Sequence, residues 1–300
     1  MSIFVGSGVA ICTPFNKEGG FNAEIYDKLI EFHAKNGTDA IISCGTTGEA
    51  VTLSEEEQIE IVKTAVFSAE KYGNERGRKL PVVAGAGSCD TAKSIKMGKA
   101  LSRAGADALM YVTPYYNKTS QAGLLEHYTA IAASVDLPVM VYNVPARTSL
   151  NILPKTMEKL AKIPNITAIK EASSNICQIA EMAERLEGNA DIYSGNDDHI
   201  IPVLSLGGVG VVSTIANIIP KDVHTLVAKY MKGEHKEALK LQLGINPLVR
   251  LIFEDISPMP VKTALRLIGY DVGACRLPLT SISDDLRDRL KAGMQNYGIL

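Results

Sequence analysis

Residues 107–172 contain three short apolar runs, which read DALMYVT (107–113), PVMVYNV (138–144) and ITAIKEA (166–172). Longer segments between them carry apolar residues at the spacing of a helix. The runs are apolar on successive residues instead of alternating, which is typical of parallel strands buried on both faces. This central stretch therefore predicts strands and helices in alternation, with the strands in the interior.

Five more runs extend the pattern in both directions: GVAICT (8–13), DAIISCG (39–45), PVVAGAG (81–87), DIYSG (191–195) and GVGVVST (208–214). Eight such repeats over about 230 residues match the size and rhythm of a (β/α)8 barrel, the TIM barrel. The alternative is a doubly wound sheet, which usually has a glycine-rich turn after its first strand. The turn here, CTPFNKEGG, has no GxGxxG motif. We therefore predict an α/β protein built on a (β/α)8 barrel.

From about Glu234 onward the strand pattern stops, and three helical segments follow: HKEALKLQLGINPLVRLIF, PMPVKTALRLIGY and ISDDLRDRLKAGMQ. We predict a catalytic barrel over residues 1–233 and a small C-terminal α-helical domain over residues 234–300. Among the barrel helices, Asn22 is a predicted N-cap and Gly37 a stop signal. Ser54 and Glu57 have the spacing of a capping box.

The composition excludes several classes of function. Lys and Arg number 31 against 33 Asp and Glu, Trp is absent and aromatic residues are only 6% of the chain. Nucleic-acid binding needs a basic surface, so we expect no nucleic-acid partner. No apolar run approaches the roughly 18 residues of a membrane span, and no N-terminal signal is visible. Five scattered cysteines without a CxxC pair are typical of a reducing compartment. We expect a soluble cytoplasmic protein without a membrane partner.

Lys170 is the most unusual residue, because it interrupts the apolar run ITAIKEA. The other 20 of the 21 lysines lie in helical, loop or turn contexts where a solvated charge is expected. One interpretation pairs Lys170 with Glu171 or another carboxylate. The other is a desolvated lysine, because burial disfavours the ammonium form and frees the amine as a nucleophile. Such an amine forms a Schiff base with a ketone, and the protonated nitrogen then draws electrons from the adjacent carbon.

Two further strand ends carry side chains suited to this chemistry, since the active site of a barrel lies at the C-terminal ends of its strands. YNVPART contains Tyr142, whose phenol can relay protons, and Arg147, whose guanidinium can clamp a carboxylate. A packed aromatic and a surface ion pair are the alternatives. In CGTTGE, Gly45 and Gly48 permit a tight turn, in which Thr46 and Thr47 could hold a small carboxylate. A plain βα turn is the alternative there.

Two other motifs are less informative. VTPYYNK places Tyr115 and Tyr116 in a loop, where adjacent tyrosines are often interface residues. SGNDDH (194–199) offers Asp197, Asp198 and His199 to a metal, but three adjacent ligands rarely converge on one ion. We expect neither a metal nor a dissociable cofactor.

GTTGE, VTPYYN, YNVPART and IKEAS follow the second, fourth, fifth and sixth predicted strands in this order. With these motifs in register, the whole chain, including SPMPVKTAL in the helical extension, resembles the pyruvate-dependent class I aldolase family, which includes N-acetylneuraminate lyase. The resemblance is closest to the lyases that condense pyruvate with L-aspartate 4-semialdehyde on the diaminopimelate route to lysine. It therefore implies this activity and these two substrates.

The resemblance also implies a proton relay. Lys170 would form the Schiff base with pyruvate, with no other cofactor, and Tyr142 would donate and accept protons. Tyr142 would be linked through the hydroxyl of Thr46 to Tyr116 of the partner subunit. The protein would then be a homo-oligomer, at least a dimer and, as is common in the family, a tetramer.

Substrate-binding roles follow from the resemblance in the same way. Thr47 would hold the pyruvate carboxylate, Arg147 would receive the carboxylate of the semialdehyde, and Gly195 and Val212 would line the pyruvate pocket. The nearest alternative is a relative that cleaves sugar acids, but such relatives generally lack this arginine. A barrel that binds pyruvate-like acids without catalysis is a further alternative.

One departure from the family concerns feedback inhibition by lysine. Lysine-sensitive bacterial members carry histidines where this chain has Glu55 and Gln58. They carry an amide and a glutamate where this chain has Cys89 and Lys93. The ammonium of Lys93 would repel the ammonium of the inhibitor. We expect weak or absent inhibition by lysine.

Overall fold

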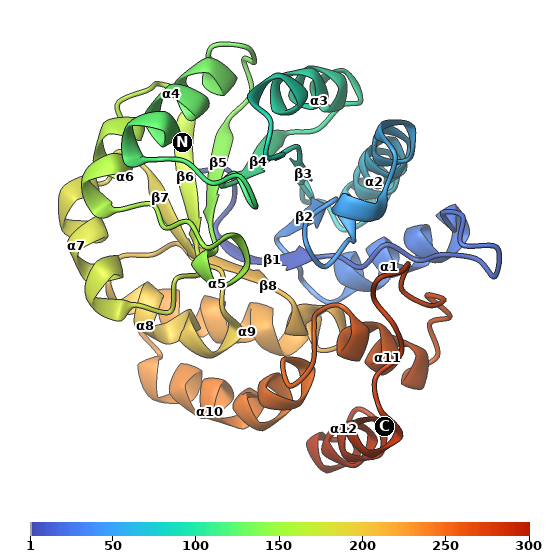
Figure 1. The fold of residues 1–300 in the computed structure, drawn as a ribbon. Helices are drawn as coiled ribbons and strands as arrows, with labels where there is room; N and C mark the ends of the chain where they lie inside the picture. The colour runs from blue at the N-terminus through green and yellow to red at the C-terminus, as the bar shows by residue number, and fades with distance from the viewer. Residues whose placement is uncertain (1) are drawn as a thin grey trace.

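The computed structural model, which describes residues 2–300, contains a closed barrel of eight parallel strands in chain order (Figure 1). The strands are β1 (Gly6–Ala10), β2 (Ala40–Ser43), β3 (Val82–Gly85), β4 (Ala108–Val112), β5 (Val139–Asn143), β6 (Ile166–Glu171), β7 (Asp191–Ser194) and β8 (Gly210–Ser213). The predicted barrel is confirmed. Only β1 departs from its predicted run: it begins two residues earlier and ends at Ala10.

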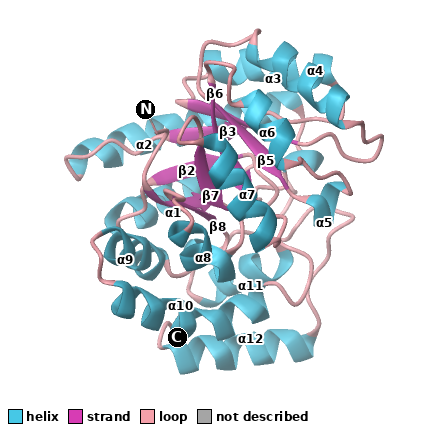
Figure 2. Cartoon of the chain, turned by 90° about the vertical axis from the view of Figure 1, so that its left-hand side faces the viewer, coloured by secondary structure: helices cyan, strands magenta, loops and turns pink. Residues whose placement is uncertain are grey.

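Two apolar layers explain why the strands are apolar on successive residues. Side chains of a strand point alternately to its two faces. In β5, Met140 and Tyr142 belong to the cluster inside the barrel, whereas Val139 and Val141 pack in the layer between strands and helices. Figure 2 shows the strands enclosed by helices. In β6, Ala168 belongs to the inner cluster, so Lys170 also faces the inside of the barrel.

The outer layer consists of helices that follow the strands. They are α1 (Ala23–Lys35), α2 (Glu55–Glu75), α3 (Thr91–Arg103), α4 (Gln121–Ala132), α5 (Pro145–Thr148), α6 (Pro154–Leu160), α7 (Ile176–Leu186), α8 (Ile200–Ser205) and α9 (Pro220–Met231). Asn22 caps α1 by accepting a hydrogen bond from the Ile25 amide, and Ser54 forms the predicted capping box with Glu57. Gly37, just beyond α1, has φ +87°, a left-handed conformation that favours glycine.

The C-terminal part forms three helices, as predicted: α10 (His235–Ile252), α11 (Met259–Leu267) and α12 (Asp284–Tyr297). In Figure 1, α10 lies beside α8 and α9, α11 lies near α1, and α12 lies below α10 and α11. Ile245 of α10 and Leu290 of α12 belong to the same apolar cluster as the outer layer of the barrel. The division into domains at residues 233 and 234 stays a prediction. Within residues 2–300, every helix is too short or too polar to cross a membrane.

Lys262 of α11 contradicts the expectation that all lysines except Lys170 are solvated. Its Nζ lies 2.8 Å from Oε1 of Glu49, and both side chains are only 1% exposed. The carbonyl of Ala274 and the ring of Phe15, whose centroid is 4.3 Å from Nζ, complete the surroundings of the ammonium. Glu49 ends the GTTGE motif, so this buried ion pair ties the helical extension to the loop after β2.

We expect Lys262→Met to lower the free energy of unfolding by about 3–5 kcal/mol, because it leaves the carboxylate of Glu49 buried without its counter-charge. The double variant Glu49→Gln/Lys262→Met removes both charges and should recover most of this loss. Urea unfolding measures both effects. As a control, Lys28→Met removes an exposed ion pair with Glu24 and should leave the midpoint unchanged. A double variant no more stable than Lys262→Met would contradict this account.

Candidate active site

Lys170 and Tyr142 lie opposite each other on neighbouring strands, because β5 and β6 pair with Tyr142 in register with Lys170. Both side chains face the barrel interior and are 6% exposed. The Nζ of Lys170 lies 4.1 Å from the centroid of the Tyr142 ring. Within residues 2–300, no carboxylate forms an ion pair with this ammonium. The interpretation of Lys170 as a partner of Glu171 is therefore wrong.

Glu171 instead locks the two strands together from the outside of the barrel. Its Oε2 accepts a hydrogen bond of 3.0 Å from Nδ2 of Asn143, and its Oε1 accepts one of 2.6 Å from the amide of Ser173. Burial raises the pKa of the Glu171 carboxyl. Asn143 and Glu171 form the rung directly after Tyr142 and Lys170. Their hydrogen bond therefore fixes the register that brings the lysine and the tyrosine together.

A cavity of about 520 Å³ opens above this pair at the C-terminal ends of the strands. Six of the eight predicted site residues line it: Thr46, Thr47, Tyr142, Arg147, Lys170 and Gly195. The remaining two do not. Val212 of β8 is buried inside the barrel in the same apolar cluster as Tyr142. Tyr116 is 95% exposed on the loop after β4, so it cannot contribute to the cavity of its own chain.

The loop with Thr46 and Thr47 is shaped differently from the prediction. Its left-handed residues are Cys44 (φ 52°) and Glu49 (φ 55°), not the flanking glycines. Gly48 is instead closely packed, because a Cβ there would lie 3.2 Å from Oγ1 of Thr13 and 3.3 Å from the Cys44 amide nitrogen. The carboxylate of Glu49 is held by Lys262, as described above. The turn is thus fixed from the helical extension, and not by glycine flexibility.

Asp197, a possible metal ligand by its sequence motif, forms hydrogen bonds with the loop after β8. Its Oδ2 accepts hydrogen bonds from the amides of Thr214 (3.1 Å) and Ile215 (2.9 Å), and burial raises the pKa of its carboxyl. Oγ1 of Thr214 lies 3.4 Å from Oγ1 of Thr47. Asp197 therefore orients the loop after β8, which in turn contacts the threonine loop. Within residues 2–300, no three His, Cys, Asp or Glu side chains converge as a metal site would require.

Gly195 lies where the ends of β6 and β7 come closest. A Cβ at this position would be 2.7 Å from Cβ of Ala172 and 3.1 Å from the Glu171 carbonyl oxygen. Any larger residue would therefore push β7 away from the strand that carries Lys170.

One wall of the cavity is formed by the connection between α10 and α11, which was not predicted. Phe253, Asp255, Ile256 and Ser257 all line the cavity, and Nη2 of Arg147 lies 3.5 Å from the Ser257 carbonyl oxygen. This segment follows a helix, so the expectation that site residues lie at the C-terminal ends of strands does not include it. The polar residues that interrupt the helical pattern, EDIS, were the available signal.

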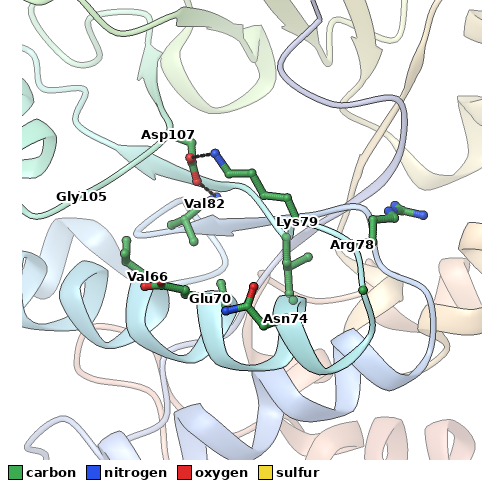
Figure 3. Close-up of a pocket in the computed structure, with 12 residues that line it drawn as sticks. Val66, Glu70, Asn74, Arg78, Lys79, Val82, Gly105 and Asp107 are labelled. Carbon is green, nitrogen blue, oxygen red and sulfur yellow. Dashed lines mark hydrogen bonds and ion pairs between the residues drawn. The ribbon is translucent and has the colours of Figure 1, made fainter.

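A larger cavity, of about 610 Å³, lies beside α2 at the N-terminal ends of β3 and β4 (Figure 3). The ammonium of Lys79 points to the carboxylate of Asp107 and pairs with it. The other oxygen of Asp107 accepts a hydrogen bond of 2.8 Å from the amide of Val82. None of the predicted site residues lines this cavity, and it lies at the end of the barrel opposite to the catalytic face. Size alone therefore does not identify the site.

We predicted weak inhibition by lysine from Glu55, Gln58, Cys89 and Lys93. These four residues lie outside the cavity. The amide of Gln58 donates to the carbonyls of Ala50 (3.1 Å) and Leu53 (3.4 Å), and Glu55 pairs with Lys96 at 2.5 Å. Both side chains are therefore engaged within the chain. Weak or absent inhibition by lysine stays a prediction.

Comparisons with known proteins identify the family and the fold of this chain. Residues 3–297 match the Dihydrodipicolinate synthetase family. The 4-hydroxy-tetrahydrodipicolinate synthase of Thermoanaerobacter sp. (strain X514) is 50% identical over 301 residues, covering 100% of this chain and 99% of the relative. The enzyme of that name from Caldicellulosiruptor bescii is 48% identical over 299 residues, covering 100% and 99%.

Two solved structures have the same fold. The dihydrodipicolinate synthase of Cyanidioschyzon merolae with lysine bound superposes with a TM-score of 0.95 at 37% identity, covering 100% of both chains. The chloride-inhibited enzyme of Acinetobacter baumannii in complex with pyruvate gives a TM-score of 0.94 at 38% identity, covering 99% of each chain.

Proposed function

We propose that this chain, which belongs to the dihydrodipicolinate synthetase family, joins pyruvate to L-aspartate 4-semialdehyde through an imine on Lys170. The lyase activity and its place in the diaminopimelate route to lysine follow from the family and from relatives of about half-identical sequence. The proposal adds the chemical route and the residues. It rests on one observation: on the floor of the cavity, the ammonium of Lys170 lies beside Tyr142 and pairs with no carboxylate within residues 2–300.

The first half of the reaction activates pyruvate. The amine of Lys170 adds to the ketone carbon, and loss of water leaves a protonated imine. The imine nitrogen then accepts the electron pair of a methyl C–H bond while its proton leaves, which gives an enamine. Tyr142 carries protons to and from the reacting atoms, since its ring is 4.1 Å from the lysine nitrogen. Thr47 and the backbone around Thr46 hold the carboxylate.

The second half forms the carbon–carbon bond. The enamine carbon attacks the aldehyde, whose oxygen takes up a proton, while Arg147 holds the carboxylate of the aldehyde substrate. The ammonium group of that substrate then loses a proton to solvent, and the resulting amine attacks the imine carbon, which closes the ring and releases the amine of Lys170. Water leaves in the first half, so the amine is regenerated without any further reactant.

Tyr116 and the oligomer complete the proposal. Tyr116 is almost fully exposed and lies outside the cavity of its own chain, which supports a role in the site of a second copy. The hydroxyl of Thr46 would connect it to Tyr142. At least a dimer is required, and we propose a tetramer. The five cysteines are all free thiols, which supports a cytoplasmic location.

A sugar-acid aldolase with the same imine chemistry is the alternative function. It would need hydroxyl partners for the sugar where this cavity presents the guanidinium of Arg147. The cavity therefore favours an aldehyde that carries a carboxylate.

Lys170→Ala should abolish the imine. Borohydride reduces a protonated imine to a stable amine, so wild-type protein treated with pyruvate and borohydride should gain a covalent adduct on Lys170, detected by peptide mass spectrometry. The variant should show none, and its turnover should fall by at least about 10³-fold. Lys162→Ala, at an exposed lysine of the outer surface, is the matched control and should react as the wild type does. An adduct of equal yield in Lys170→Ala would rule out the proposed nucleophile.

Arg147→Ala should separate the two substrates. Loss of a charged hydrogen bond to the carboxylate should raise KM for L-aspartate 4-semialdehyde by roughly 10- to 100-fold, while the yield of trapped pyruvate adduct stays unchanged. Pyruvate consumption is measured with the semialdehyde and, in parallel, with N-acetylmannosamine. Turnover of the wild type only with the sugar would favour the alternative function.

Two inactive variants should complement each other if Tyr116 acts in a second copy. Tyr116→Phe should lower turnover by about 10²-fold, because it removes a proton relay. Co-expressed with Lys170→Ala, it forms mixed dimers in which one of the two sites has both native groups. Activity should then recover to about a quarter of the wild-type value. If the mixture has only the average activity of the two variants, Tyr116 acts within its own chain.

A further inference from the structure

Three charged side chains on the wall of the cavity lack ion-pair partners. Within residues 2–300, Lys170, Arg147 and Asp255 form no ion pair, whereas Asp198 lies 3.6 Å from His199 and Glu254 pairs with Arg289. The proposed function assigns roles to the two cations, Lys170 and Arg147. It leaves Asp255 without a role.

Asp255 lies in a segment that is anchored on both sides of it. It lies in the connection between α10 and α11, half-buried, where its Oδ1 accepts a hydrogen bond of 2.7 Å from the amide of Ile256. The Met259 amide donates to the Ile256 carbonyl at 2.9 Å, and α11 itself is anchored by the buried pair of Lys262 and Glu49. Because the segment is supported by these contacts, its side chains are suited to bind a ligand in a defined position.

Asp255 is also close to Arg147 along the wall. Nη2 of Arg147 lies 3.5 Å from the carbonyl oxygen of Ser257, only two residues beyond Asp255. The guanidinium and the carboxylate nevertheless do not pair with each other. One positively charged and one negatively charged residue thus line the same cavity.

This arrangement matches the charges of the aldehyde substrate. L-aspartate 4-semialdehyde carries a carboxylate and an ammonium group on one carbon, two bonds from the aldehyde carbon. An ammonium that enters a partly desolvated cavity loses hydration, which must be replaced by a counter-charge or hydrogen bonds. We propose that Asp255 binds this ammonium group while Arg147 binds the carboxylate. The inference rests on the proposed function and adds the selection of α-amino aldehydes over aldehydes without the amine.

No other carboxylate described in residues 2–300 can serve as well. Asp255 is the one acidic residue that lines this cavity. Asp197 is buried and already accepts hydrogen bonds from two backbone amides. Asp198 lines only an adjoining cavity, which shares Ser174, Asn196 and Phe253 with this one. Two charged anchors and the reacting aldehyde define three points, so the same pair would also distinguish the L from the D substrate.

Asp255→Asn tests this inference. KM for L-aspartate 4-semialdehyde should rise by roughly 10- to 100-fold, because a charged hydrogen bond is lost. Succinate semialdehyde has the same carboxylate and aldehyde but no amino group, so its inhibition constant as a competitor should be unchanged. The KM for pyruvate and the yield of borohydride-trapped adduct should also be unchanged. Asp255→Glu should restore part of the affinity.

Asp198→Asn is the matched control, since it removes an equal charge outside the cavity. It should leave all of these constants at their wild-type values. An unchanged KM for L-aspartate 4-semialdehyde in Asp255→Asn would overturn the inference, and so would an equal loss for both aldehydes. Failure of the proposed function has a different signature, because wild-type protein would then form no pyruvate adduct or fail to consume L-aspartate 4-semialdehyde.

Discussion

The pairing of β5 with β6 is the constraint on which the site depends. Parallel strands alternate their side chains, so one register places Lys170 and Tyr142 together inside the barrel and Asn143 and Glu171 together outside it. A shift of β6 by one residue relative to β5 would turn Lys170 toward the outer helices while Tyr142 stayed inside, so both pairs would be broken. The hydrogen bond between Asn143 and Glu171 stabilises the correct register, so the outer pair determines the geometry of the inner one.

Much of the fold could be predicted because its signals are local. Strands buried on both faces are apolar at every position, and the caps at Asn22 and Ser54 are read from neighbouring residues. The candidate site was also largely predictable, since Lys170, Tyr142 and the threonine loop all follow strands of a barrel. The motifs in register, rather than any single residue, indicated the family.

The residues that escaped prediction depend on contacts between distant parts of the chain. Nothing near Lys262 in the sequence indicates burial, because its carboxylate partner lies 213 residues away. The wall formed by Asp255 and Ser257 was missed for the same reason, since a position after a helix gains its meaning only when α10 and α11 pack on the barrel. Likewise, the left-handed conformations at Cys44 and Glu49 cannot be read from a motif whose glycines appear sufficient to explain the turn.

The pair of Lys262 and Glu49 also bears on the order in which the enzyme is made. A ribosome completes the loop with Thr46 and Thr47 early in synthesis, yet the buried carboxylate of Glu49 in that loop has no counter-charge until α11 has emerged. A nascent barrel that ends before residue 262 would have its strands, but the carboxylate of Glu49 would lack its counter-charge and would be costly to bury. The packing of this loop against the helical extension is therefore completed only after all the strands have been made.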